Sequence, residues 1–437
     1  MSIMRYLLIG AVLCTCAGSM PSLEDHHKLL LLSIDGVRWD QTDDMKGFRY
    51  IQENGVRAEY MIPAFPSHTS PCHMSIATGL HTESHGVVHN GYYDLKNNRT
   101  GQTGFHGTLF ISEWFDNGQE PIWITASSQG LKSGGYLYPG SNCTYKGRVP
   151  TRSILDAYPT IPTENDWRKR IDDVISWFSD DDFDFIALYL EGLDEISHEF
   201  GPNSKEVYHE KQVVDRFLQY MFKQVKLAGL EDDLNIIIVS DHGQLDVEVS
   251  YVDEKGINLT RYIDPNWITF VFSYGPLGLI EPVPEFKTRV YETLKSAHSH
   301  MDVYYKEDIP ERYHYKNHER VPSIVVVAHP GYQMYDEHPG FEALGGDHGY
   351  DNRLELMRAI YYSVGPSFKK GVRITEFESI NVYPLMCYLL GLDPATNNGT
   401  LDKLYSILKK DEEERKFDMK KTLTILAFTC FVLYTLL

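Results

Sequence analysis

Apolar residues are distributed along the chain in two patterns, short unbroken runs and stripes with a helical period. The unbroken runs predict buried strands and cover residues 29–34, 122–126, 185–190, 236–240, 324–328 and 358–364. Helical stripes occupy residues 167–178, after a start signal at Thr163, and residues 204–228, before Gly229. Because runs and stripes alternate, they predict an α/β fold with a mostly parallel central sheet flanked by helices. Residues 251–315 are less regular and indicate an insertion or subdomain.

Both ends of the chain carry segments that are typical of membrane targeting. Arg5 precedes an apolar stretch and then small residues, which predicts a signal peptide over residues 1–19. Residues 420–437 are largely apolar and predict a C-terminal membrane anchor, either a transmembrane segment or a lipid-anchor signal. The charged residues 396–419 are expected to form a juxtamembrane stalk, which leaves residues 28–395 as the catalytic domain. We therefore expect a protein of the secretory pathway, held at the cell surface with this domain outside.

Glycosylation signals and cysteine usage agree with this route. The sequons begin at Asn98, Asn142, Asn258 and Asn398. Outside the two terminal segments the cysteines are Cys72, Cys143 and Cys387. Such an odd number argues against a disulfide scaffold. The net charge of −20, with no compensating basic stripe, argues against binding to duplex nucleic acid, but a small anionic substrate can still bind through cations.

Acidic and histidine side chains occur where the predicted strands end. They are Asp35, Asp194, His198, Asp241, His242 and, in a later glycine-rich loop, His348. Because parallel strands bind ligands at their carboxyl ends, we expect these groups to converge there, beneath the insertion. Asp194 and His198 are four residues apart and therefore share one helical face. Carboxylate and imidazole donors favour a hard or borderline cation, with zinc as the first expectation.

One threonine and one asparagine are candidates for the chemical step. Thr69 lies just before Pro71, where a helix is expected to begin. Its hydroxyl can cap that helix or act as a nucleophile, and as a nucleophile it needs metal coordination to lower its pKa. The helix N-terminus would favour a phosphate beside it. Asn90 is either an ordinary turn residue or a hydrogen-bond donor to a phosphoryl oxygen.

The segments that contain these candidate residues occur along the chain in the same order as in the ectonucleotide pyrophosphatase/phosphodiesterase family of the alkaline phosphatase superfamily. The chain resembles that family from Lys28 to about Thr400. The resemblance implies an alkaline-phosphatase-like fold and two zinc ions. One ion would be held by a set in which Thr69 is the attacking group, namely Asp35, Thr69, Asp241 and His242. The other would activate the hydrolytic water and be held by Asp194, His198 and His348. Asn90 matches the asparagine with which the family contacts phosphate.

The resemblance also implies a reaction and its substrates. The enzyme would hydrolyse nucleotide phosphodiester or pyrophosphate bonds to nucleoside 5′-monophosphates through a phosphothreonine intermediate. The chain departs from the family where an aromatic residue usually follows the nucleophile, because Ser70 stands there, and Cys72 replaces the usual asparagine. Losing one stacking wall weakens base recognition by about 1–3 kcal/mol. Tyr138 and Tyr158 are the candidates for the other wall of a base or head-group slot.

Two alternatives to a nucleotide-cleaving enzyme follow from these departures. Choline- or glycerol-linked phosphodiesters and lysophospholipids form an alternative substrate class, since Ser70 leaves space for a different pocket. A non-catalytic cell-surface module is the second alternative, because a fold alone does not determine function. That module would be expected to have lost at least one ligand position, and every expected ligand is present.

Overall fold

The computed structural model describes residues 26–96, 99–100, 104–155, 162–247, 255–335 and 345–409. The predicted signal peptide over residues 1–19, the C-terminal segment 420–437 and the sequon at Asn98 lie outside these ranges. None of the helices within these ranges combines the length and the apolar character needed to span a membrane.

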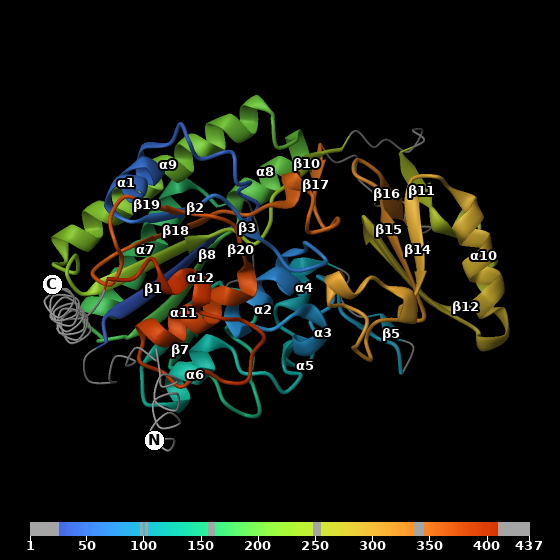
Figure 1. Cartoon of the computed structure of the whole chain (residues 1–437), viewed down its shortest axis with the longest axis horizontal. Coiled ribbons are helices and arrows are strands. Elements are labelled where there is room, and N and C mark those ends of the chain that lie inside the picture. Colours follow the sequence, from blue (N-terminus) through green and yellow to red (C-terminus); the bar gives the residue numbers. More distant parts are fainter. Residues whose placement is uncertain are drawn as a thin grey trace, which may run out of the picture.

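Within the described residues, an eight-stranded and mostly parallel sheet forms the centre of the larger body (Figure 1). Its strands, in spatial order, are β19 (Val372–Ile374), β2 (Val56–Ala58), β18 (Tyr361–Val364), β9 (Leu234–Val239), β1 (Lys28–Ile34), β8 (Phe185–Leu190), β6 (Ser133–Tyr136) and β7 (Arg152–Ile154). Strand β1 runs parallel to both neighbours, so Leu31 lies between Ala187 and Ile237. Strand β18 runs antiparallel to β9 and β2. The predicted α/β fold with a mostly parallel central sheet is confirmed.

Helices pack on both faces of this sheet (Figure 1). One layer contains α1 (Lys46–Asn54), α7 (Glu164–Ser179), α8 (Gly192–Phe200) and α9 (Lys205–Leu227). The other contains α2 (Thr69–Thr78), α6 (Ile122–Ser128) and α11 (Val382–Leu389). Shorter elements around them are α3 (Thr82–His85), α4 (Phe105–Thr108), α5 (Ser112–Phe115), α12 (Asp402–Tyr405), β3 (Met61–Ile62), β4 (Tyr93–Asp94), β5 (Arg99–Thr100) and β20 (Phe377–Glu378).

The two helices predicted from apolar stripes are confirmed as α7 and α9. Thr163 and Asp166 form a capping box at the start of α7, each side chain bonding the backbone N–H of the other. Ser204 caps α9 by accepting from the N–H of Val207, and Gly229 follows the end of α9 with a φ of 70°. Both apolar stripes are buried, which anchors the helices to the sheet.

Two of the predicted strands differ from the expectation. Residues 122–126 belong to helix α6, which begins after Pro121, and not to a strand. All five residues are buried, and a short run that is apolar on every side has no periodicity to distinguish helix from strand. Residues 324–328 do form a strand, but in a second sheet and not in the central one.

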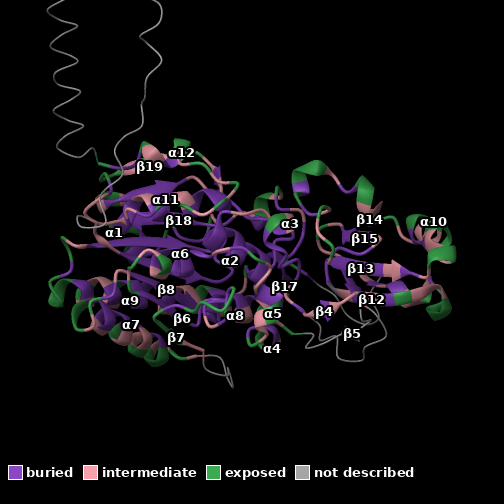
Figure 2. Cartoon of the chain, turned by 90° about the horizontal axis from the view of Figure 1, so that it is seen from below, coloured by how far each residue is buried: buried purple, intermediate pink, exposed green. Residues whose placement is uncertain are grey.

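A second, six-stranded sheet lies beside the larger body (Figure 1). Its strands, in spatial order, are β11 (Gly256–Asn258), β16 (Gln333–Tyr335), β12 (Ile268–Gly275), β13 (Leu277–Pro282), β15 (Ile324–Ala328) and β14 (Met301–Tyr305), and α10 (Lys287–Ala297) packs against it. The sheet has a hydrophobic core of its own, and Figure 2 shows buried residues in both bodies. The predicted insertion over residues 251–315 is therefore a subdomain that also includes residues up to Tyr335.

The chain after residue 395 remains part of the folded body as far as Lys409. Leu404 and Ile407 are fully buried, and the N–H of Asn398 donates to Gly79 O at 2.8 Å. Residues 396–409 of the predicted stalk therefore belong to the folded body, because they bury apolar side chains that the charge pattern conceals, and residues 410–419 lie outside the described residues.

The structure places three cysteines and three of the sequon asparagines among the described residues. Cys72, Cys143 and Cys387 are buried and unbridged. Asn142 and Asn258 are half-buried, whereas Asn398 is exposed.

Replacing a buried leucine of the central strand tests whether burial in the central sheet stabilises the fold. Leu31 is fully buried in β1, so Leu31→Ala is expected to lower the free energy of unfolding by about 2–5 kcal/mol through lost burial and a residual cavity. Leu227→Ala is the matched control, since Leu227 is 70% exposed and its loss is expected to change the stability by less than about 0.5 kcal/mol. Denaturant unfolding measures both, and equal losses would contradict this account of the core.

Candidate active site

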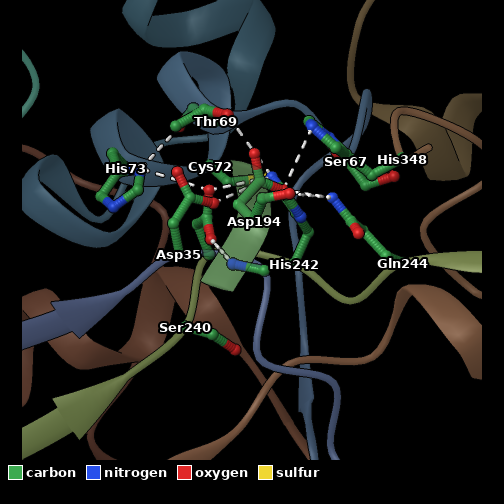
Figure 3. A network of polar contacts seen from close by, with 12 residues as sticks. Asp35, Ser67, Thr69, Cys72, His73, Asp194, Ser240, His242, Gln244 and His348 are labelled. Carbon is green, nitrogen blue, oxygen red and sulfur yellow. Dashed lines mark hydrogen bonds and ion pairs between the residues drawn. The ribbon is translucent and has the colours of Figure 1, made fainter. Parts of the chain in front are cut away.

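The six predicted acidic and histidine ligands lie in two groups of three at the carboxyl ends of the central strands (Figure 3). One group consists of Asp35, which follows β1, with Asp241 and His242, which follow β9. The other consists of Asp194 and His198 on α8 with His348, which follows the short strand β17 (Gly346–Asp347). Within each group the candidate ligand atoms lie within 4.8 Å of one another. The tertiary structure thus brings together the two sets that the resemblance implies.

The three histidines of these groups make the same kind of hydrogen bond through Nδ1. Each ring bonds through Nδ1 to a backbone carbonyl, His198 to Gly346 O at 2.9 Å, His242 to Gly243 O at 3.1 Å and His348 to Ser67 O at 2.8 Å. Because a carbonyl only accepts, Nδ1 carries a proton, and Nε2 is the nitrogen left to bind a metal ion. Nε2 of His198 lies 3.2 Å from Asp194 Oδ2, and Nε2 of His242 lies 3.0 Å from Asp241 Oδ2. This carbonyl-held tautomer is the usual arrangement of histidines that bind metals.

The two carboxylates of the first group, Asp35 and Asp241, are buried beside each other. Asp35 Oδ1 and Asp241 Oδ2 are buried, and neither has a hydrogen-bond partner in the described structure. Burial and the neighbouring Asp241 carboxylate raise the pKa of Asp35 well above its usual range. Against the effect of burial, His242 and His73 hold the pKa of Asp241 below its usual range. Two adjacent buried carboxylates with orphaned oxygens fit a divalent cation, which would remove their repulsion.

Thr69 is the first residue of α2, and its hydroxyl faces the first group of ligands. His68 is the N-cap residue, and no side chain caps the helix. The Thr69 Oγ1 atom lies 3.5 Å from Nε2 of His242 and accepts from Nδ2 of Asn90 at 3.4 Å. Of the two interpretations that the sequence left open, capping therefore does not occur, and the hydroxyl is available for chemistry.

Asn90 is held against the start of α2 by its own carbonyl oxygen. That atom, Oδ1, accepts from the backbone N–H of Ser70 at 2.8 Å. The bond orients the amide so that its Nδ2 points at the Thr69 hydroxyl. Of the two interpretations of Asn90, this orientation favours that of a donor at the site over that of an ordinary turn residue.

Two residues that the sequence analysis did not select hold the carboxylates in place. The side-chain amide of Gln244 donates to Asp194 Oδ1, and the hydroxyl of Tyr189 donates to Asp35 Oδ2. Tyr189 lies on β8 beside β1, so only the sheet register brings it to Asp35. Their types carry no sequence signal, since buried Gln and Tyr are common donors in protein interiors.

His73 is a further residue that the sequence analysis did not select. It lies one turn after Thr69 on α2, and its Nδ1 donates to Thr69 O at 2.8 Å. The Ser33 hydroxyl and the other ring nitrogen, Nε2, are hydrogen-bonded at 2.8 Å, and burial lowers the pKa of His73. With both nitrogens occupied, His73 positions the start of α2. Its spacing of four residues from Thr69 was the available signal.

The predicted walls of the substrate slot are not where the sequence placed them. Tyr138 is fully buried, and its hydroxyl donates to His73 O at 3.1 Å. It packs edge-on against Trp123, so it belongs to the core, and the prediction that it lines the slot is wrong. Ser70 is also fully buried, and only its backbone N–H takes part in the site. Tyr158 lies outside the described residues.

Known proteins with this sequence pattern and fold identify the family. A family model described as type I phosphodiesterase / nucleotide pyrophosphatase matches residues 29–351. Ectonucleotide pyrophosphatase/phosphodiesterase family member 7 of Mus musculus is 39% identical over 411 residues, which cover 91% of each chain. This chain belongs to the ectonucleotide pyrophosphatase/phosphodiesterase family. It is therefore a hydrolase of the phosphodiesterase/pyrophosphatase class, and the predicted resemblance is confirmed.

Other members of the ectonucleotide pyrophosphatase/phosphodiesterase family extend this comparison to structure and ligand. Bis(5′-adenosyl)-triphosphatase of Xenopus laevis is 33% identical, covering 92% of this chain and 87% of that protein. Murine family member 5, an inactive threonine-to-alanine variant in complex with AMP, matches with a TM-score of 0.80 and 32% identity, covering 88% of this chain and 100% of that one. The alkaline-phosphatase-like fold is confirmed by this match.

Removing the amide that holds Asp194 tests whether the second group is organised for a metal. Gln244→Ala is expected to weaken zinc binding by about 10–100-fold, because Asp194 loses the donor that orients it. Gln219→Ala is the matched control, since that amide also donates to a carboxylate, Asp215, but outside the site. Competition with a chromogenic chelator measures both affinities. Equal zinc affinity in both variants would show that this hydrogen bond does not support a metal site.

Proposed function

We propose that this family member is a zinc-dependent phosphodiesterase that cleaves nucleotide phosphodiester or pyrophosphate bonds outside the cell and releases nucleoside 5′-monophosphates. The proposal is carried by one observation, the Thr69 hydroxyl beside the first of two groups of buried carboxylate and imidazole donors. The name of the Xenopus laevis relative and the AMP in the murine structure support a nucleotide substrate. The prefix ecto- in the names of relatives supports a location outside the cell, whereas the C-terminal anchor stays a prediction.

The donor sets fit two ions of borderline softness. Asp35, Asp241, His242 and Thr69 would hold one zinc ion, and Asp194, His198 and His348 the other. Bound there, the two ions would neutralise charge at phosphorus and lower the pKa of the Thr69 hydroxyl and of water.

The reaction that these residues would perform has two steps. Thr69 Oγ1 attacks phosphorus in line, so that a new O–P bond forms while the bond to the leaving group breaks. Water then attacks the phosphothreonine, which releases the phosphate ester and restores the hydroxyl. Asn90 Nδ2, already aimed at Oγ1, donates to a non-bridging oxygen in both steps. The N-terminus of α2 favours the anionic group bonded to Thr69.

A second substrate class is favoured by the burial of the expected slot walls. Ser70 and Tyr138 both lie in the interior, so neither provides a surface for stacking a base. Choline- or glycerol-linked phosphodiesters and lysophospholipids need no such wall. They would use the same attack by Thr69, because they differ from nucleotide esters in the group that stays esterified to phosphorus and not in the bonds that form and break.

Removing the Thr69 hydroxyl tests the proposed nucleophile. Thr69→Ala is expected to lower kcat on a 5′-nucleotidyl nitrophenyl ester by at least about 10³-fold, since no other atom takes over the attack. Thr69→Ser is the matched control, because it keeps the hydroxyl and is expected to keep measurable turnover. Chelation is expected to abolish the activity of the wild type, and added zinc to restore it.

The same assay on a nitrophenyl phosphorylcholine separates the two substrate classes. Preference for the nucleotide ester supports the proposal, and preference for the phosphorylcholine ester selects the second class. Activity that survives Thr69→Ala or chelation would refute the mechanism for both classes.

Asn90→Ala tests the donor to the transferred group. The loss of one aimed donor is expected to lower kcat by about 10²–10³-fold with a small effect on KM. Asn54→Ala, at a half-buried asparagine outside the site whose Nδ2 donates to Tyr50 O in its own helix, is the control and is expected to leave kcat unchanged. Equal kcat values in the two variants would remove Asn90 from the mechanism.

A further inference from the structure

A second group of metal-type donors lies outside the active site, at the edge of the smaller sheet. Strand β14 is the edge strand of that sheet, and β15 is its only neighbour among the described strands. The group consists of His298 and His300, which precede β14, Asp302 within β14, and His329, which directly follows β15. We refer to these residues as the edge cluster. None of them takes part in the two groups described above.

The alternation of side chains at the start of β14 places His300 and Asp302 on one face. Met301 and Val303 are 7% and 1% exposed and point into the core, so His300 and Asp302 point to the opposite face and are exposed. His298 precedes the strand across a turn at residues 299–300, and its Nδ1 accepts from the backbone N–H of His300 at 3.2 Å, so Nε2 is its candidate ligand atom.

The strand register brings His329 to the same face. Met301 pairs with Ala328 in the antiparallel ladder, so His300 stands opposite His329. Their backbones are joined by a hydrogen bond from His329 N to His300 O at 3.0 Å. Directly opposed residues have their Cβ atoms about 4.5–5.5 Å apart on one face, which is close enough for two imidazoles to reach one ion.

The distances between the rings are near those of histidines that share an ion. The ring centres of His298 and His300 are 5.6 Å apart, and those of His300 and His329 are 6.0 Å apart. Two imidazoles on one tetrahedral zinc, with Zn–N bonds of about 2.0–2.1 Å, have centres about 5 Å apart. Inside the active site, the centres of His198 and His348 are 5.0 Å apart. Side-chain rotations are needed to converge the edge cluster, because its donor atoms do not lie as close together as those of the two active-site groups.

Two further contacts organise these donors. His329 Nε2 lies 3.5 Å from Asp302 Oδ2, so a carboxylate already stands beside the imidazoles. His300 stacks on Tyr332 with ring centres 4.2 Å apart, which limits the freedom of its ring. A ring that is already ordered loses less conformational entropy when it binds an ion.

We propose that the edge cluster is a third metal site, which binds zinc or a similar borderline cation such as copper or nickel. Three imidazoles and one carboxylate form a donor set that these ions prefer over calcium or magnesium. When bound, the ion joins the segment after α10 to the end of β15 and so ties down the open edge of the smaller sheet. The proposal does not depend on the proposed catalytic function.

Counting bound zinc tests the proposal. The full-length protein is stripped with a chelator, equilibrated with micromolar free zinc and analysed by elemental mass spectrometry. The wild type is expected to hold one zinc equivalent more than the His300→Ala/His329→Ala variant. His81→Ala/His314→Ala is the matched control, because it removes another pair of adjacent histidines, stacked at 3.8 Å, and is expected to bind as much zinc as the wild type.

The comparison between variants keeps this test separate from the active site. If the catalytic groups bind no zinc, the zinc content of the wild type and of every variant is lower by the same amount. The expected difference of one zinc equivalent between the wild type and the His300→Ala/His329→Ala variant remains. Equal zinc in the wild type and in the His300→Ala/His329→Ala variant overturns the proposal. Circular dichroism of the metal-free proteins checks the fold, and His300→Gln/His329→Gln, which keeps side chains of similar size, replaces the alanine pair in the same comparison if that pair does not fold.

Discussion

The repulsion between buried carboxylates at the ends of parallel strands is the constraint on which the site depends. Asp35 and Asp241 follow the adjacent strands β1 and β9, so the sheet itself forces them together. Burial makes their charges costly, and the raised pKa of Asp35 expresses that cost. A bound cation relieves the repulsion, which makes metal binding and the local stability of this edge two consequences of the same arrangement.

The backbone orients the ligands as much as the side chains do. Three carbonyl groups fix the histidine tautomers, and they come from segments that are far apart in the chain, including Ser67 before α2 and Gly346 on β17. Gly349 has a φ of 103°, and a Cβ there would meet the His68 ring at 2.1 Å. The loop that carries His348 can therefore pack against His68 in this conformation only with glycine at position 349.

Helix α2 connects the metal ligands to the chemistry. Its first residue presents the hydroxyl, its second backbone N–H orients Asn90, and its fifth residue, His73, ties the helix to β1 through Ser33. The same helix buries Ser70, and Tyr138 packs behind it. In the proposed mechanism the attacking hydroxyl would therefore be held in place without contacts to the nucleoside or head group of the substrate.

The sequence by itself determined the class of fold, helices α7 and α9, strands β1, β8 and β9, and both groups of ligands, because apolar periodicity and residue type are local properties. It misplaced residues 122–126, because a short run that is buried on all sides has no period. Only the tertiary structure decided that Tyr138 is a core residue, that Gln244 and Tyr189 hold the carboxylates, and that His300 stands opposite His329. Each of these follows from strand register and packing between distant segments, which no local pattern encodes.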